Sequence, residues 1–457
     1  MDTSALNVTR TWFDEHLSEA LDQLHHEGHS KWFAKSLLIP SVSLLAAFAN
    51  YEGFGWYLSQ PDGTTQLCLG LSREWQWDSP QGLTRMQRHT EALLREGLAE
   101  DTLVVGGLSF SPASRWSDWP GAYSALPMVQ ITQNGRDTRL SARLPLDGSQ
   151  PPEYYRDKLD AVWQALAAAA PIAAIGQNPV SIMPRPSRKE WMERVREGAA
   201  NIRAGRFEKV VLARALALTY ERPLNIYAIV ENLRAQNPEA STFAVRRHGS
   251  VFLGATPELL ARVRDHHLEG MSLAGSASRG LTPEEDSRLA AEMKENPKII
   301  HEHAVVRRHI QESLHHLTLS LDMPETPSLK RLPTVQHLHT PLEAELRADA
   351  TIWSVIGSLH PTPAVAGYPV DIATHYIVEH GEPFPRGWYA GAIGWSTLGG
   401  DGQWMVSLRS GVVRGATVEL YAGCGIMGDS VPEAELAESD WKFSTMLGAL
   451  EIESELR

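Results

Sequence analysis

Short strand-like segments outnumber helical segments in this 457-residue chain, and the two kinds follow one another irregularly. Alternating or β-branched stretches bounded by turn residues predict strands at 65–70, 102–110, 122–132, 209–214, 241–245, 250–253 and 388–395, and a hairpin of 404–413 with 417–422. This mixture predicts an α+β fold with a large antiparallel sheet layer.

Helix signals are fewer but well marked. Ser187 and Glu190 form a capping-box pattern ahead of an apolar stripe that ends at Gly205, and Thr282 caps a second helix. Three further helices are predicted at 151–170, 298–317 and 433–451.

Charge, cysteine content and hydropathy exclude several classes of protein. The acidic residues exceed the basic ones by 55 − 42 = 13, which argues against a nucleic-acid binder. Two distant cysteines, Cys68 and Cys424, cannot form a disulfide framework or a cysteine-rich zinc module. The longest apolar run, 37–49, is interrupted at Pro40 and is too short to span a bilayer. We therefore expect a cytoplasmic protein without a nucleic-acid or membrane partner.

The C-terminal helix carries two acids and a lysine on one face. Glu435, Glu438 and Lys442 are spaced i, i+3 and i+7, beside an apolar stripe. Such a face can bind Mg²⁺ through oxygen and pair Lys442 with an anion. The alternative is a solvated face with an ordinary Glu–Lys pair, which helical spacing alone favours.

Two other motifs suggest metal or nucleotide binding but fit poorly. Neighbouring residues on a helix point about 100° apart, so His301 and His303 cannot easily share a zinc ion with Glu302. Glu302 suits Mg²⁺ better, or simply lies on a polar surface. The run 423–428 matches G-x-G-x-x-G, but only 29 residues follow it, too few for the rest of a βαβ unit. We expect this loop to donate backbone N–H groups to a carboxylate.

Lys209 and Glu258 are candidate proton-transfer groups. Lys209 lies inside an apolar strand, where burial favours the neutral amine that acts as a general base, although an edge-strand lysine facing solvent gives the same pattern. Glu258 follows Ala255-Thr256-Pro257 at a strand-to-turn junction, where an acid at a helix start is the simpler explanation.

Taken together and in order, these segments resemble the chorismate-utilising enzymes, the isochorismate, salicylate, anthranilate and aminodeoxychorismate synthases. The matching stretches are FEKVVLAR (207–214), GATPELL (254–260), LAGSASR (273–279), HEHAVV (301–306), LHPTPAVAGYP (359–369), GWYAGAIGW (387–395) and 421–447, which ends in KFSTML. Residues 181–457 therefore resemble the chorismate-binding region, and residues 1–180 resemble the N-terminal half more loosely.

The resemblance implies one large domain, an α/β sandwich of stacked antiparallel sheets covered by helices, and it implies residue roles. Glu302 and Glu438 match Mg²⁺ ligands, with Glu435 as a helper, and the metal would hold the ring carboxylate of chorismate. Groups that match the substrate-binding positions are Arg409, Lys442, Gly423 and Gly425 around the side-chain carboxylate, and Gly275 and Ser276 against the ring carboxylate.

Branch-specific positions favour isochorismate synthase. Lys209 matches the base of the water-using branch, and the loop at 274–276 lacks the nucleophilic lysine of aminodeoxychorismate synthases. Lys209 would deprotonate a water that attacks ring C2, and Glu258 would protonate the departing C4 hydroxyl. This needs a neutral lysine and a protonated acid together, which burial favours for both.

Several alternatives stay open. The long N-terminal half resembles the menaquinone-type enzymes more than the siderophore type. A salicylate synthase, an inactive chorismate-binding scaffold and a zinc hydrolase are the competing functions. The sequence leaves the oligomeric state and any product channelling open.

Overall fold

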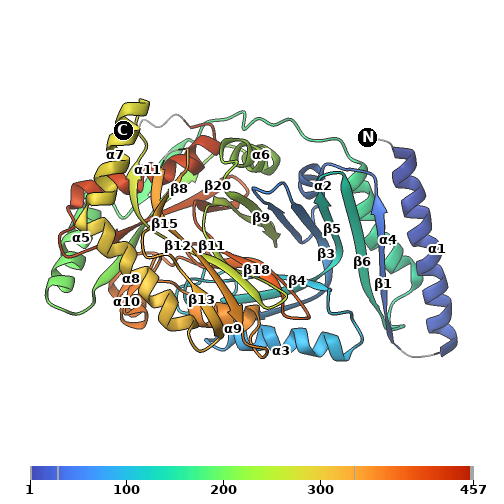
Figure 1. Ribbon diagram of the computed structural model, residues 1–457. Coiled ribbons are helices and arrows are strands. Elements are labelled where there is room, and N and C mark those ends of the chain that lie inside the picture. Colours follow the sequence, from blue (N-terminus) through green and yellow to red (C-terminus); the bar gives the residue numbers. More distant parts are fainter. Residues whose placement is uncertain (1–2, 28–29, 334, 453–457) are drawn as a thin grey trace.

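The computed structural model describes residues 3–27, 30–333 and 335–452, and every strand pairing in these ranges is antiparallel. Helices and strands mix irregularly, which confirms the predicted α+β class. Figure 1 shows the strands running through the middle of the molecule, with helices at both ends and along its outside. None of the described helices has the length and hydropathy needed to cross a membrane.

One continuous sheet runs through most of the molecule. Successive pairings join, in spatial order, β7 (Ser181–Arg185), β8 (Lys209–Thr219), β20 (Thr417–Ile426), β19 (Ser410–Arg414), β10 (Ser250–Thr256), β9 (Ser241–Arg247), β2 (Gly55–Ser59), β3 (Thr65–Trp77), β5 (Ala122–Asn134), β6 (Asp137–Leu146) and β1 (Lys31–Ile39). The two-residue strand β16 (Gly367–Tyr368) pairs with the start of β8.

A second run of strands branches from β5. It passes through β4 (Leu103–Leu108), β17 (Ala392–Thr397), β18 (Gly402–Val406), β11 (Leu259–Arg264), β12 (His267–Ser278) and β15 (Val335–Leu346). Strands β13 (Thr318–Asp322) and β14 (Ser328–Arg331) pair with successive parts of β15. Pairs β2–β9 and β4–β17 cross residue 180, so the two halves of the chain share both runs of strands.

The helices pack in two groups. Those against the first sheet or one another are α1 (Thr3–Glu27), α2 (Leu44–Asn50), α4 (Pro152–Ala167), α5 (Arg188–Arg203), α6 (Ile226–Gln236) and α11 (Pro432–Ala449). Those near the second run are α3 (Gly82–Arg95), α7 (Pro283–Glu295), α8 (Pro297–Leu314) and α9 (Ile352–Leu359), while α10 (Val370–Tyr376) leads into the π-helical turn η1 (Ile377–Gly381) beside β8.

Two apolar cores match this layering. One joins residues of both strand runs, including Phe252 and Trp404, and the other lies under the helices, including Phe443 of α11. Strand β8 lies between the cores and is buried along almost its whole length. Its continuous apolar run follows from burial on both faces, and Lys209 and Arg214 are the charged exceptions.

Local predictions held at the caps and failed at some boundaries. The Ser187–Glu190 capping box and the Thr282 cap are both present. The predicted strand at 388–395 was wrong in its first half, because β17 starts only at Ala392 and the preceding residues turn around the buried Trp388. The prediction of a loop at 423–428 was wrong for its first four residues, because Gly423–Ile426 is the end of β20.

Candidate active site

Eight of the eleven predicted site residues line one cavity of about 50 Å³ between β8 and β20 on one side and β12 and β15 on the other, and Lys209, Glu435 and Glu438 are not part of its lining. By volume this corresponds to roughly four water molecules. The walls include Glu258, Gly275, Ser276, Glu302, His337, Arg409, Gly423, Gly425 and Lys442. Polar groups from six separate segments thus converge on one small space.

Lys209, the first residue of β8, lies next to Glu302 of the cavity wall. Its side chain is fully buried, and Nζ lies 2.9 Å from Glu302 Oε1. The ammonium makes no well-aligned hydrogen bond within the part of the chain that the structure describes. Lys209 is therefore buried and held next to Glu302 by charge attraction. The alternative of a solvent-facing edge lysine is wrong.

Glu302 reaches Lys209 because Gly425 leaves room for its carboxylate. A Cβ atom at Gly425 would lie 2.2 Å from Glu302 Oε1 and 3.1 Å from Lys209 Cε. Burial alone would raise the pKa of Glu302, but the adjacent Lys209, helped by Lys298 and Lys442, lowers it below the usual value. Glu302 is thus held ionised, as a metal ligand must be.

The acidic face of α11 is buried rather than solvated. Glu435 is only 1% exposed and pairs with Lys298 of α8, whose Nζ lies 2.5 Å from Oε1, while Oε2 has no hydrogen-bond partner among the described residues. Burial, reinforced by the neighbouring Glu438, raises the pKa of Glu435. The alternative of an ordinary solvated face is therefore wrong.

Glu438 and Lys442 form the expected i, i+4 pair. Their Nζ and Oε1 atoms lie 2.6 Å apart, and the same ammonium donates to the Gly423 carbonyl at 2.8 Å. Although burial opposes it, Glu438 raises the pKa of Lys442, which stays charged. The lysine is thus placed to present positive charge to the cavity.

The acids on α11 can hold a divalent cation. Ligand atoms of Cys424, Glu435 and Glu438 lie within 4.8 Å of one another. Burial raises the pKa of the Cys424 thiol well above its usual value, so this residue offers a thiol and not the thiolate that zinc requires. The remaining donors are carboxylate oxygens, the ligands that Mg²⁺ prefers, with the unpartnered Glu435 oxygen among them.

Glu258 lies across the cavity from these acids, in the turn between β10 and β11. Its backbone N–H donates to Thr256 Oγ1, and a strand rather than a helix follows, so the helix-start explanation is wrong. Burial raises the pKa of Glu258 to about 7, even though Lys209, Arg409, Lys330 and Lys442 all lower it. A large fraction of this carboxyl group is protonated near neutral pH.

A chain of hydrogen bonds links the remaining predicted residues. Ser276 Oγ lies 2.9 Å from His337 Nδ1, and Arg409 Nη2 lies 3.4 Å from His337 Nε2. Burial, with Arg409 close by, lowers the pKa of His337 well below its usual value, so the imidazole is neutral. Gly275, at φ +73°, forms a bulge in β12 that aims Ser276 at this chain.

The glycines of β20 lie in a strand and line the cavity, and their predicted contact with the substrate stays a prediction. Gly423 and Gly425 pair with β8 in the sheet instead of forming a donor loop. A Cβ atom at Gly423 would lie 2.9 Å from the Tyr389 hydroxyl oxygen. Because glycine has no side chain, Gly423 leaves room for Tyr389 and Gly425 leaves room for Glu302.

Sequence reasoning missed four groups around the cavity. Tyr389 is buried in its wall, and burial raises the pKa of its phenol to about 12. Arg386 forms a buried ion pair with Glu382 and donates to the carbonyls of Val211 and Val365. Lys298 and Lys330 were also missed, because single lysines on a helix or strand carry no pattern.

Known proteins match nearly the whole chain. A sequence profile of the chorismate binding enzymes matches residues 17–451. The salicylate biosynthesis isochorismate synthase of Pseudomonas aeruginosa is 34% identical over 409 residues, which cover 86% of this chain and 84% of that protein. Isochorismate synthase MenF of Bacillus subtilis is 29% identical over 97% of this chain and 98% of its own length.

A solved structure matches as well. The menaquinone-specific isochorismate synthase MenF from Escherichia coli aligns with a TM-score of 0.81 and 27% sequence identity, covering 95% of this chain and all of that one.

Proposed function

This chain belongs to the chorismate binding enzyme family, and we propose that it is a Mg²⁺-dependent isochorismate synthase that converts chorismate to isochorismate. Relatives named isochorismate synthase align over almost the full length, which supports this activity. The observation that carries the proposal is that the site holds both a buried lysine, Lys209, and a buried carboxyl group in the cavity wall, Glu258, whose pKa lies near 7.

Substrate binding follows from the charges at the cavity. Chorismate is a dianion, and the guanidinium of Arg409 and the ammonium of Lys442 both face the cavity. We expect them to bind the side-chain carboxylate, and we expect the bulge at Gly275 and Ser276 to lie against the ring carboxylate. The neutral His337 fixes Arg409 and Ser276 in place without adding charge.

Mg²⁺ would be held by Glu302 and Glu438, with Glu435 near them, and when bound it would anchor the ring carboxylate. The carboxylate donors and the raised pKa of the Cys424 thiol suit this ion better than zinc. In the structure each of these acids pairs with a lysine, Lys209, Lys442 and Lys298 respectively. The three ion pairs offset the negative charge of these carboxylates.

The chain's own residues carry the proton transfers. With its amine neutral, Lys209 takes a proton from the water that attacks ring C2, and Glu258 gives a proton to the C4 hydroxyl as it leaves. A carboxyl group with a pKa of about 7 is well suited to act as the acid at neutral pH. Reprotonation of Glu258 and loss of the proton from Lys209 to solvent then restore the starting state.

We further propose that the product serves menaquinone synthesis in the cytoplasm. The support is similarity along the whole chain, including the N-terminal half, to enzymes of the menaquinone type. The second candidate is a siderophore-type role, and the relative from Pseudomonas aeruginosa, named for salicylate biosynthesis, shows that similar enzymes also serve pathways other than menaquinone synthesis. Deleting the gene in its own organism separates them, because loss of menaquinone supports the first and loss of the aromatic siderophore supports the second.

Product analysis tests the activity itself. Purified protein incubated with chorismate and Mg²⁺ should form isochorismate, detected by chromatography and by coupling to an isochorismatase. Formation of salicylate and pyruvate would instead make it a salicylate synthase, and binding of chorismate without turnover would make it a scaffold.

A further inference from the structure

A row of polar side chains crosses three neighbouring strands beside the cavity. Ser276 of β12 pairs with His337 of β15, which in turn pairs with Lys330 of β14. Side chains of directly paired residues point to the same face of a sheet. Lys330 therefore continues the row formed by Ser276 and His337, at its outer end.

Lys330 contacts the turn that carries the proposed acid. Its Nζ donates to the carbonyl of Pro257 at 2.9 Å, one residue before Glu258. Pro257 is buried, and a buried carbonyl needs a donor. Burial lowers the pKa of Lys330, and the nearby Glu258 acts in the opposite direction. The ammonium thus both anchors the Glu258 backbone and contributes to its electrostatic environment.

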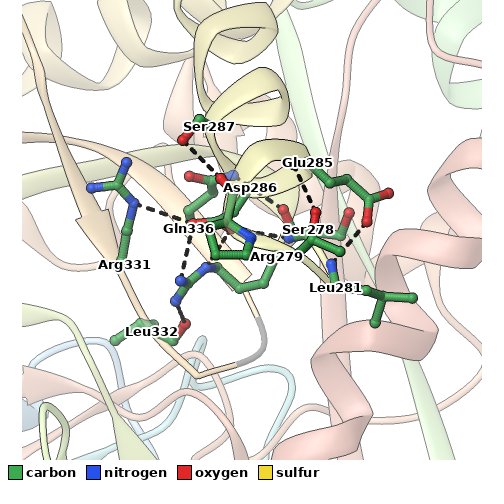
Figure 2. A network of polar contacts seen from close by, with 12 residues as sticks. Ser278, Arg279, Leu281, Glu285, Asp286, Ser287, Arg331, Leu332 and Gln336 are labelled. Atoms are coloured by element: carbon green, nitrogen blue, oxygen red, sulfur yellow. Dashed lines mark hydrogen bonds and ion pairs between the residues drawn. The ribbon is translucent and has the colours of Figure 1, made fainter.

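Strand β14 is held in place by the network in Figure 2. Arg279 makes two hydrogen bonds to Asp286, at 2.7 and 3.0 Å, and donates to the Leu332 carbonyl at 2.7 Å. Arg331, next to Lys330, lies 3.6 Å from Asp286, and Gln336 of β15 donates to the Ser278 carbonyl at 3.1 Å. The residues that directly follow Lys330 are thus held in place.

The other cations that face Glu258 have other partners or tasks. Lys209 of β8 pairs with Glu302, and Lys442 of α11 pairs with Glu438. Arg409, in the turn between β18 and β19, contacts His337. Of the three lysines near Glu258, Lys330 is the one without a carboxylate partner within hydrogen-bonding distance among the described residues.

We propose that Lys330 is a positioning residue for Glu258: it holds the Pro257–Glu258 turn in place and keeps a positive charge beside the carboxyl group that donates the proton. This rests on the proposed function, in which Glu258 is the general acid. Loss of the Lys330 charge makes Glu258 keep its proton to higher pH, because a nearby cation favours the ionised form. Loss of the hydrogen bond releases the turn.

The test compares Lys330→Met with Lys330→Arg, and uses Lys35→Met, at an exposed lysine of β1, as the matched control. In Lys330→Met the alkaline limb of the pH profile of kcat/KM should move up by about half to one pH unit. At its pH optimum kcat should fall by about tenfold while KM changes little, as expected for one lost hydrogen bond to a charged donor. Lys330→Arg and Lys35→Met should follow the wild type.

An alkaline limb that stays in place in a folded Lys330→Met protein would overturn the inference, and so would an equal shift in Lys330→Arg. A readout independent of turnover is the titration of the Glu258 carboxyl by infrared difference spectroscopy, with Glu258→Gln identifying the band. If no isochorismate forms but this titration moves up in Lys330→Met alone, the proposed function fails and the coupling of Lys330 to Glu258 stands. A titration that does not move refutes the coupling itself.

Discussion

Replacing Glu258 by glutamine should abolish turnover and yet stabilise the fold at alkaline pH. Burial raises the pKa of this carboxyl group from 4.5 to about 7, so the folded protein binds its proton more tightly than the unfolded chain does. Stability contributed by this group is therefore fully present below about pH 4.5 and is lost as the pH rises through 7. The amide side chain of the Glu258→Gln variant cannot ionise, so the variant does not lose this stability.

The size of the effect follows from the pKa difference. A shift of 7 − 4.5 = 2.5 units corresponds to about 3 kcal/mol in the free energy of unfolding above pH 8. For a chain of 457 residues this equals a rise of about 3 °C in Tm.

The assay is urea or thermal unfolding of wild type and Glu258→Gln between pH 5 and 9. The difference in stability should be small at pH 5 and grow to its full value by pH 8. The variant Glu15→Gln, at an exposed position of α1, should show no such growth. A difference between Glu258→Gln and wild type that is independent of pH would refute the reasoning, because it would mean that Glu258 ionises in the folded protein as it does in water.

Three further predictions concern the proposed base and the proposed metal ligands. Lys209→Ala should stop isochorismate formation while chorismate still binds by calorimetry, and near-normal turnover would remove Lys209 as the base. Gly425→Ala should displace Glu302, since the new Cβ would lie 2.2 Å from its carboxylate, and lower kcat by about a hundredfold, whereas Gly428→Ala, with its nearest contact at 3.5 Å, should stay active. Glu438→Gln should weaken Mg²⁺ binding measured by calorimetry without substrate, and an unchanged affinity would exclude Glu438 as a ligand.

The sequence predicted the class of fold and many of its elements because these depend on local patterns. The cap at Thr282, the helix face of Glu435, Glu438 and Lys442, and the strand beginning at Lys209 are all encoded within about ten residues. Boundaries were less accurate, as at the strand expected from residue 388, because a glycine-rich stretch does not show where the chain turns.

Burial at the site could not be predicted, because it depends on elements distant in sequence. Spacing alone favoured a solvated α11 face, but Lys298 of α8 packs against Glu435, 137 residues away. The role of Gly425 becomes visible only when the position of Glu302 is known. In the same way, the role of Lys330 becomes visible only from its hydrogen bond to the Pro257 carbonyl. In each case the partner is brought close by sheet pairing or helix packing, and nothing near the residue in sequence indicates it.

Turnover of chorismate in water enriched in ¹⁸O tests the central claim most directly. If a water activated by Lys209 adds at C2 while the C4 hydroxyl leaves, each isochorismate molecule formed in the forward reaction gains one ¹⁸O atom, located at C2 by mass spectrometry. Isochorismate that forms without label would contradict this account, because the hydroxyl group would then have moved within the substrate.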